Sequence, residues 1–387
     1  MELKLDTTKT YAIALEGGGA RGAYEVGVWK ALDEAGIKYN AVSGTSVGAL
    51  NGALMAMRDL ERAVDIWSNI CFSQVMAVDD EEMRKFFRME LGLGDLKTFV
   101  KRVVELIKSR GFDVSPLRKW IGEVADENVV RRSDVDFYIT TYSITDRKSL
   151  ELRASELEDG QLCDMLLASA YLPTFRNEKL GGKRYTDGGI QDAVPVHSLV
   201  ANGYKDIIVV RLYGMGVVRR FKMPEDVRLT TIAPTAALGS VLNFDREQSL
   251  RNLTLGYYDA KRVLYGLYGT DYYLERTLSE SEAYELLREF IGQYIETLSR
   301  DITLRDLNEK ILPEVAKNLG VKGDYYNLLI ACMERLAKGL NLPAFRIIKD
   351  TELLEEFRSK IGTSRRALVR AVSYVARKKP RISVLLP

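Results

Sequence analysis

The sequence of 387 residues has only one histidine and three cysteines, so it offers few of the side chains that build metal sites and disulfide frameworks. The cysteines (Cys71, Cys163 and Cys332) are odd in number and share no short metal-type spacing. They are therefore expected to be free thiols in a reducing compartment. No hydrophobic run approaches the ~18 apolar residues of a membrane-spanning helix, and the acidic N-terminus does not resemble a signal peptide. A soluble, cytoplasmic protein is expected.

An excess of charge of one sign is also missing. The chain carries 56 Lys and Arg against 54 Asp and Glu, a formal charge of +2, which is too balanced for binding nucleic acid by bulk attraction. The balance is uneven along the chain. Residues 1–213 hold 28 basic against 32 acidic residues, and residues 214–387 hold 28 against 22. Hydrophobic residues make up 46% and charged residues 28%, as in ordinary globular proteins.

The first third of the sequence repeats a strand–turn–helix pattern. Short apolar strands are expected at residues 11–15 and 39–43, and each is followed by a glycine-containing turn and a helix, at 23–35 and 49–57. Residues 60–125 are expected to be helical throughout. This pattern predicts an α/β sheet with helices on both faces.

The rest of the sequence predicts fewer strands. Strand patterns return at residues 135–141 and 207–212, and no strand is expected after about Gly216. We therefore expect a catalytic domain over residues 1–213 and a mostly helical region over 214–387, which could also pack as part of one domain.

Three consecutive glycines (Gly17, Gly18 and Gly19) and Gly22 lie between the first strand and the first helix. Gly17-x-Gly19-x-x-Gly22 matches the dinucleotide fingerprint, but that interpretation needs an acidic residue at the end of the second strand, and none occurs at 42–44. A tight turn without a ligand is another interpretation. Glycine N–H groups at a helix N-terminus could also bind the oxyanion of a tetrahedral intermediate.

Residues 44–48 read Gly-Thr-Ser-Val-Gly, which is Gly-x-Ser-x-Gly at the junction of the second strand and its helix. A sharp turn there exposes the hydroxyl of Ser46, and Gly44 and Gly48 carry no side chain to obstruct so tight a bend. Ser46 is therefore the candidate nucleophile, and it needs a base.

Two residues are candidates for that base. His197 is the single histidine of the chain, but at the start of an expected helix it is interpreted as a structural or capping residue. Asp187 precedes Gly188 and Gly189, which leave space beside its carboxylate. Desolvation could raise the pKa of Asp187 enough for it to act as a base, although Asp-Gly-Gly by composition alone is typical of a turn.

Together, the glycine loop at 17–22, the serine motif at 44–48 and the Asp-Gly-Gly motif at 187–189 resemble those of the patatin-like phospholipase family in residues, order and spacing. The resemblance covers about residues 10–213. It implies a three-layer α/β/α sandwich, here with a mostly helical C-terminal extension. It also implies a Ser–Asp dyad without histidine, in which Ser46 is the nucleophile and Asp187 the general base.

The resemblance assigns the remaining site residues as well. The backbone N–H groups of Gly17, Gly18 and Gly19 would form the oxyanion hole, and Arg21 would have a supporting role beside it. Supporting positions are also implied for the glycines that flank the dyad, which are Gly44, Gly48, Gly188 and Gly189. One departure is that Asp192-Ala193 stands where many members have asparagines, which concerns substrate contacts rather than the dyad.

The implied activity is that of a lipid acyl hydrolase of phospholipase A or lysophospholipase type, with an acyl-serine intermediate and no metal or cofactor. The expected partner is a phospholipid or another lipid ester, and no nucleic acid. Two alternatives stay open: a carboxylesterase acting on neutral or short-chain acyl esters, and a nucleotide-binding module that uses the glycine loop.

The basic second half suggests a further partner. Residues 366–377 form an amphipathic pattern with arginines on one face, and Arg219, Arg220 and Lys222 form a second basic cluster. A basic amphipathic helix can lie on anionic lipid, although a solvated helix packed on the core has the same pattern. Peripheral contact with an anionic membrane is therefore a hypothesis.

Overall fold

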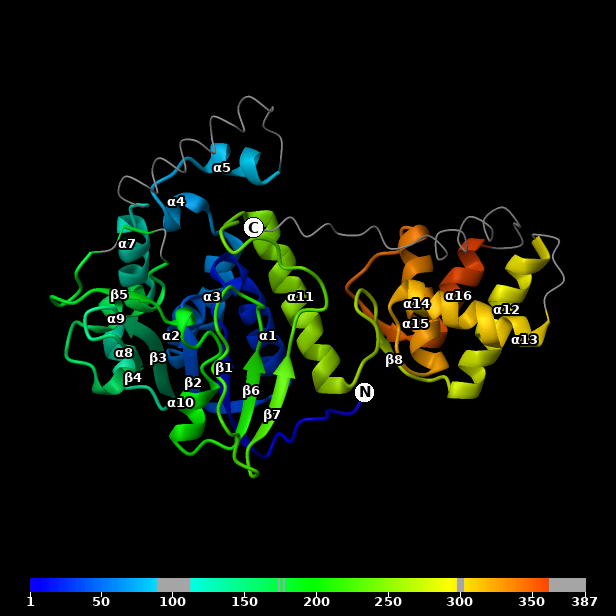
Figure 1. Cartoon of the computed structure of the whole chain (residues 1–387), viewed down its shortest axis with the longest axis horizontal. Coiled ribbons are helices and arrows are strands. Elements are labelled where there is room, and N and C mark those ends of the chain that lie inside the picture. Colours follow the sequence, from blue (N-terminus) through cyan, green and yellow to red (C-terminus); the bar gives the residue numbers. More distant parts are fainter. Residues whose placement is uncertain (89–111, 173–174, 177, 298–302, 362–387) are drawn as a thin grey trace. The chain divides into compact units, whose positions relative to one another are not determined.

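The computed structural model (Figure 1) divides the chain into two compact units. The larger unit comprises residues 3–261, and the smaller comprises residues 262–387 together with residues 1–2. The division falls inside α11 (Arg246–Tyr265). The structure describes residues 1–88, 112–172, 175–176, 178–297 and 303–361.

A mixed sheet forms the centre of the larger unit, and its described strands run in the order β4-β3-β2-β1-β6-β7, with β5 also paired to β3. Five of them are parallel, whereas β4 and β5 run antiparallel to β3. The strands are β1 (Thr10–Leu15), β2 (Lys38–Thr45), β3 (Asp136–Ser143), β4 (Lys148–Arg153), β5 (Tyr185–Asp187), β6 (Asp206–Val210) and β7 (Arg228–Ile232).

The central strands form where the sequence predicts them, because their apolar residues are buried on both faces. Every residue of β1 after Thr10 is buried, as are residues 207–210 of β6. The prediction of no strand after Gly216 is wrong, since β7 pairs with β6 in parallel. β7 lies at the edge of the sheet and four of its five residues are at least partly exposed, so it lacks the apolar run that reveals a buried strand.

Helices cover both faces of this sheet, as the sequence predicts (Figure 1). Val196 and Leu199 of α10 pack on Ala12, Ala41 and Val209 of one face. On the opposite face, α2 lies so close that a Cβ on Gly52 would be 2.6 Å from the ring of Phe137. Helices of the larger unit are α1 (Ala23–Glu34), α2 (Val47–Ala56), α3 (Leu60–Ser68), α4 (Phe72–Val75), α5 (Asp80–Phe87), α7 (Ser115–Val124), α8 (Glu127–Arg131), α9 (Leu162–Ser169) and α10 (Val196–Ala201).

Most of α11 belongs to the larger unit because it packs backbone to backbone on α1. A Cβ on Gly27 would lie 2.0 Å from the carbonyl oxygen of Leu253, and a Cβ on Gly256 would lie 2.0 Å from that of Tyr24. Only glycine permits such contact. The expected domain boundary at residue 213 therefore lies inside the larger unit, which also contains β7 and most of α11.

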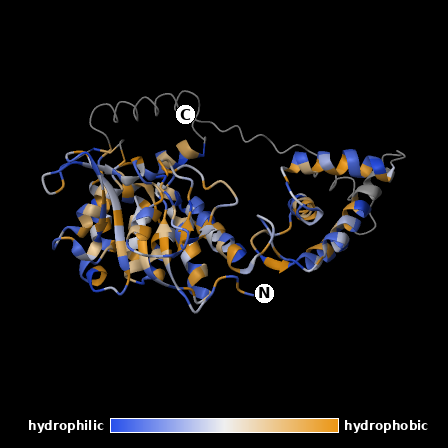
Figure 2. Ribbon diagram, turned by 60° about the horizontal axis from the view of Figure 1, so that its bottom comes forward, coloured by the Kyte–Doolittle hydropathy of each residue, from blue (hydrophilic) through white to orange (hydrophobic). Residues whose placement is uncertain are grey.

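The smaller unit is mostly helical, in line with the prediction, and has its own hydrophobic core. Its amphipathic helices are banded blue and orange in Figure 2. Tyr272, Leu329, Met333, Leu353 and Phe357 are fully buried in that core. The elements are α12 (Glu280–Thr297), α13 (Leu304–Asp306), η4 (Leu307–Ile311), α14 (Leu312–Leu319), α15 (Tyr325–Gly339) and α16 (Asp350–Ile361), with the parallel pair β8 (Tyr273–Glu275) and β9 (Ile347–Lys349).

A helix must be both long and apolar to cross a membrane. Among the described helices, none combines the length and the apolar character needed to cross a bilayer. The basic amphipathic pattern predicted at residues 366–377 lies outside the described residues.

Candidate active site

Strand register brings Ser46 and Asp187 together. β4 pairs along one edge of β3, so β2 and β5 share the opposite edge. There Thr45 of β2 lies opposite Thr140, and Asp187 of β5 lies opposite the next residue, Thr141. Because Ser46 directly follows Thr45, the serine and the aspartate end at adjacent positions of the sheet although 141 residues separate them in the sequence.

The turn that carries Ser46 is strained. Ser46 has φ 56° and ψ −124°, a left-handed conformation that a residue with a side chain adopts only when its surroundings enforce it. Close packing enforces it here, since a Cβ on Gly44 would lie 2.2 Å from the carbonyl oxygen of Gly48, and one on Gly48 would lie 2.5 Å from that of Leu15. The turn places Ser46 at the N-terminus of α2, where the helix dipole favours negative charge.

A second serine holds this turn in place. The backbone N–H of Ser46 donates to Oγ of Ser169 (2.8 Å), and that hydroxyl donates to the carbonyl oxygen of Thr140 (2.7 Å). Ser169 lies at the end of α9 and is fully buried. Its hydroxyl thus links the nucleophile turn to β3. Sequence reasoning gave Ser169 no role.

Asp187 is buried beside Ser46, and burial raises the pKa of its carboxyl to about 6. Hydrogen bonds from the Ser46 hydroxyl and from the backbone N–H of Gly189 (2.7 Å) oppose this shift because they stabilise the carboxylate. The carboxylate is thus a desolvated acceptor whose pKa the nearby hydroxyl of Ser46 lowers. Gly188 must be glycine, since a Cβ there would lie 2.4 Å from the carbonyl oxygen of Thr140.

The glycine loop runs against Ser46, since a Cβ on Gly17 would lie 3.3 Å from the Cβ of Ser46. The N–H of Gly17, expected in the oxyanion hole, instead donates to the carbonyl oxygen of Ala193 (3.0 Å). Within the described part of the chain, the N–H groups of Gly18 and Gly19 have no acceptor. Gly19 has φ +55°, and a Cβ there would lie 2.2 Å from the carbonyl oxygen of Val241.

Two charged residues, the half-buried Arg21 and the buried Glu16, hold the glycine loop and its neighbours. Arg21 donates from Nε to the carbonyl oxygen of Gly239 (2.9 Å) and from Nη1 to those of Leu212 (3.2 Å) and Tyr213. Glu16 accepts from the backbone N–H groups of Leu212 (2.6 Å) and Tyr213 (3.0 Å). The guanidinium of Arg21 is therefore directed at backbone carbonyls, which gives this residue a structural position next to the loop.

A network that sequence reasoning missed joins the glycine loop to α2. Asn51 donates to the carbonyl oxygen of Gly22 (3.0 Å) and to Glu25 (2.8 Å), and it accepts from the indole N–H of Trp67 (2.9 Å). Burial raises the pKa of Glu25 well above its usual value. No sequence pattern marks these residues, because the network depends on contacts between distant helices.

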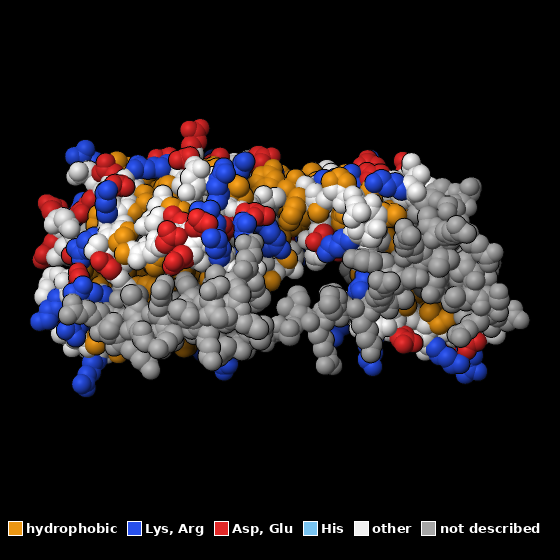
Figure 3. Space-filling model, turned by 90° about the horizontal axis from the view of Figure 1, so that it is seen from above, with side chains coloured by type: hydrophobic (Ala, Val, Ile, Leu, Met, Phe, Trp, Pro, Cys, Tyr) orange, Lys and Arg blue, Asp and Glu red, His pale blue; other side chains and the backbone are white. Residues whose placement is uncertain are grey.

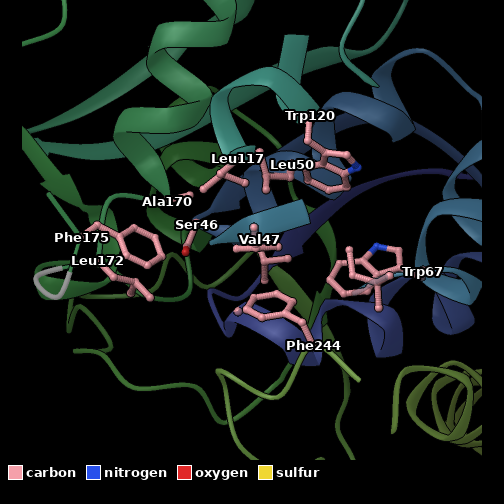
Figure 4. A pocket seen from close by; sticks show the side chains of 13 residues that line it. Ser46, Val47, Leu50, Trp67, Leu117, Trp120, Ala170, Leu172, Phe175 and Phe244 are labelled. Atoms are coloured by element: carbon pink, nitrogen blue, oxygen red, sulfur yellow. The ribbon is translucent and has the colours of Figure 1, made fainter. Parts of the chain in front are cut away.

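An apolar cavity of about 40 Å³ opens beside Ser46 (Figure 4). In Figure 4 the Ser46 side chain lies between Val47 and the pair Leu172 and Phe175. The remaining lining comes from segments far apart in the sequence, namely Gly19, Leu50, Trp67, Ile70, Val75, Leu117, Trp120, Ala170 and Phe244. Polar atoms are scarce on these walls, so the cavity suits an alkyl chain rather than a nucleotide.

His197 interacts away from the dyad. Its Nδ1 lies 3.3 Å from a carboxylate oxygen of Glu151, and its ring packs edge-on against Phe221 (5.2 Å between centroids). Asp192 is buried, and burial raises the pKa of its carboxyl to about 6. Its backbone carbonyl accepts from the hydroxyl of Thr45 (2.9 Å). Within the described residues, no group of three His, Cys, Asp or Glu side chains could bind a metal ion.

Comparisons with known proteins identify the segment that carries this geometry. Residues 13–200 match a family model described as patatin-like phospholipase. Lysophospholipase nte1 of Aspergillus terreus is 56% identical over 48 residues, which are 12% of this chain and 3% of that protein. Patatin-like phospholipase domain-containing protein 7 of Rattus norvegicus is 27% identical over 213 residues, which are 53% of this chain and 14% of that protein.

These two relatives are matched over only a small part of their length. Among solved structures, VipD from Legionella pneumophila aligns over 95% of this chain and 92% of its own, with 13% identity and a TM-score of 0.39. That score is too low to support any conclusion.

Proposed function

Residues 13–200 belong to the patatin-like phospholipase family, and from that premise we propose that this chain hydrolyses acyl esters of lipids through a Ser46–Asp187 dyad. One observation carries the proposal. The Ser46 hydroxyl lies at the wall of an apolar cavity and acts on the buried carboxylate of Asp187, whose pKa burial raises to about 6. A nucleophile, a base and a site for an alkyl chain thus meet at one point.

In the proposed reaction Asp187 accepts the proton of Ser46 as the serine oxygen attacks the ester carbonyl. The strained turn fixes the hydroxyl toward the carboxylate, and Ser169 fixes the turn. The N–H groups of Gly18 and Gly19 are the proposed oxyanion donors, and the N-terminus of α2 adds its dipole. The protonated aspartate then donates to the leaving alcohol, which leaves an acyl-serine.

Deacylation uses the same groups in reverse order. Asp187, again ionised, accepts a proton from water as that water attacks the acyl-serine carbonyl, and the fatty acid leaves as Ser46 recovers its proton. His197 is not needed in this sequence of steps, because its ring is held by Glu151 and Phe221 instead.

The cavity supports a lipid acyl group as the part of the substrate next to Ser46. Its lining is almost wholly aliphatic and aromatic, and each methylene that leaves water for such walls contributes about 0.8 kcal/mol. The cavity of about 40 Å³ would take the part of the acyl chain next to the ester.

Fatty-acid release from a lysophospholipid and a diacyl phospholipid tests the proposal, with short p-nitrophenyl esters as the comparison. A lipid hydrolase prefers the long-chain lipids and loses this activity in Ser46→Ala. A preference for p-nitrophenyl butyrate would instead support the carboxylesterase alternative. If no ester were cleaved and ATP or NAD raised the melting temperature, the glycine loop would be a nucleotide site and the proposal would be wrong.

A further inference from the structure

The loop after β6 exposes an unusual group of apolar side chains. Tyr213, Met215, Val217 and Val218 are 57%, 74%, 55% and 47% exposed. Elsewhere in the described larger unit, large exposed hydrophobic residues occur singly, as at Val129 and Leu229. Single exposed residues are normal, but four within six positions mark an interaction surface.

This loop is fixed to the candidate active site through its backbone. The N–H of Val217 donates to the carbonyl oxygen of Gly189 (2.8 Å), and the N–H of Ala193 donates to that of Val217 (2.7 Å). A Cβ on Gly214 would lie 1.9 Å from the carbonyl oxygen of Gly17. The loop is therefore in contact both with the glycine loop and with the residues that follow Asp187.

The loop lies where the parallel strands end, since it directly follows β6 and the nucleophile turn directly follows β2. Figure 3, a view from above relative to Figure 1, shows hydrophobic side chains among charged ones on the described surface.

Basic residues continue the exposed apolar segment. Arg219, Arg220 and Lys222 follow Val218, and no acidic residue occurs between 213 and 222. Arg219 pairs with Glu151 (2.7 Å). Arg220 and Lys222 are exposed and form no ion pair within the described part of the chain. Phe221 between them is half-buried against His197, so the two free cations project from an anchored segment.

We propose that residues 213–222 form a docking loop that inserts its apolar residues into an anionic lipid surface while Arg220 and Lys222 contact lipid headgroups. The combination of exposed apolar and cationic side chains favours this partner, because a membrane interface offers hydrocarbon beneath negative charge. Docking there would bring the backbone of the glycine loop and the residues after Asp187, which this loop contacts, close to the lipid surface. The inference rests on the proposed function for its physiological meaning, and binding can be measured separately from hydrolysis.

Vesicle co-sedimentation of the full chain tests the proposal, with Ser46→Ala as the background so that no lipid is consumed. The vesicles are phosphatidylcholine alone, or phosphatidylcholine with roughly 30% phosphatidylglycerol, an anionic content within the range that attracts basic segments. Since each basic residue near an anionic surface strengthens binding about fivefold, R220Q/K222Q should weaken binding roughly 25-fold. M215S/V218S should weaken it about tenfold or more.

Matched controls carry the same changes at other places. K38Q/K205Q removes two cations at the opposite edge of the sheet, where β2 and β6 begin, and V129S/L229S removes two single exposed hydrophobic residues. Both controls should bind within about twofold of the parent. Equal binding by loop and control variants, or equal binding to neutral and anionic vesicles, would overturn the proposal.

Two further readouts separate the alternatives. If M215S/V218S converted a dimer into a monomer in analytical ultracentrifugation and left vesicle binding unchanged, the loop would contact a second copy of the chain and the proposal would be wrong. With Ser46 intact, loop variants should cleave a soluble p-nitrophenyl ester like the wild type. A chain that bound vesicles through the loop but cleaved no ester would support this inference and contradict the proposed function.

Discussion

Each of the two units buries an aspartate, and the surroundings shift the pKa values of these two residues in opposite directions. In the larger unit, burial raises the pKa of Asp187 to about 6, and two hydrogen bonds do not offset it. In the smaller unit, Asp350 is fully buried as well, and burial again acts to raise its pKa. Hydrogen bonds from Thr277, Leu278 and Tyr326 outweigh that effect and lower the pKa of Asp350.

Under the proposed function, the difference is that between a carboxylate that acts as a base and one that has a structural role. Asp350 accepts from the backbone N–H groups of Thr277 (2.9 Å), Leu278 (3.1 Å) and Thr351 (2.8 Å). It also accepts from the hydroxyl of Tyr326 (2.8 Å) and from that of Thr277, so its charge is satisfied and joins the loop to the helix. Asp187 is left with fewer donors, one of them the hydroxyl of Ser46. A carboxylate with unused capacity to accept a proton can act as a base.

Among substitutions that test the difference between Asp187 and Asp350, the largest expected effect is the loss of activity in Asp187→Asn. Asp187→Asn keeps the shape of the side chain and removes the base, so kcat should fall by about 10³–10⁴, the order seen when a general base is removed. Initial rates of ester hydrolysis measure this. Asp350→Asn is the matched control in the smaller unit and should keep most of the activity wherever the chain is folded.

For folding stability, Asp350→Asn should have the larger destabilising effect of the two substitutions. Asp350→Asn removes the charge that five donors satisfy and should lower the free energy of unfolding of the smaller unit by about 3 kcal/mol, as measured by denaturant unfolding at pH 7. The lowered pKa of Asp350 stabilises the fold above the unfolded-state pKa, and this contribution is lost as the pH falls through the folded value.

The raised pKa of Asp187 has the opposite effect on folding stability. Ionisation of this buried carboxyl lowers the free energy of unfolding, and the full loss is reached above about pH 6. Asp187→Asn should therefore not destabilise the larger unit at pH 8, and it should stabilise it by up to about 3 kcal/mol. A large loss of stability in this variant would show that Asp187 is structural like Asp350.

A smaller loss of activity is expected from Ser169→Ala. This change removes the acceptor for the backbone N–H of Ser46 and loosens the strained turn, so kcat should fall about 10- to 100-fold while KM changes little. Ser169→Thr keeps the hydroxyl and should restore part of the rate. Full activity in Ser169→Ala would mean that close glycine packing alone holds the turn.

The smallest of the expected effects concerns how kcat/KM depends on pH. Because the base must be ionised, the rate should rise about tenfold per pH unit below pH 6 and level off above it. Asp192 has a pKa raised to about 6 as well, so Asp192→Asn is the control. This variant should retain the inflection, and loss of the inflection would assign it to Asp192 instead.

The sequence predicts the central strands beneath the candidate site better than the elements around them. The strands that end at the motifs are apolar and central, so β1, β2 and β6 stand out by composition. The roles of Ser46 and Asp187 came from the family resemblance, and the register of β2 and β5 on β3 now supplies a physical reason for their meeting. Those roles remain predictions until they are tested.

Other features depend on contacts that no local pattern encodes. β4 and β7 are partly exposed edge strands with polar side chains, and β5 has only three residues, so none of them has a clear period. Trp67, Trp120 and Phe244 line one cavity from three distant helices or loops. The N–H of Gly17 donates to the carbonyl oxygen of Ala193, and only folding brings these two residues together.

The central claim is that buried Asp187 activates Ser46, and covalent labelling with a fluorophosphonate tests it most directly. Intact mass should show one adduct on the wild type, none on Ser46→Ala, and much slower labelling of Asp187→Asn, while Asp350→Asn is labelled at the wild-type rate. Labelling of Asp187→Asn as fast as the wild type, or an adduct on Ser46→Ala, would contradict the account.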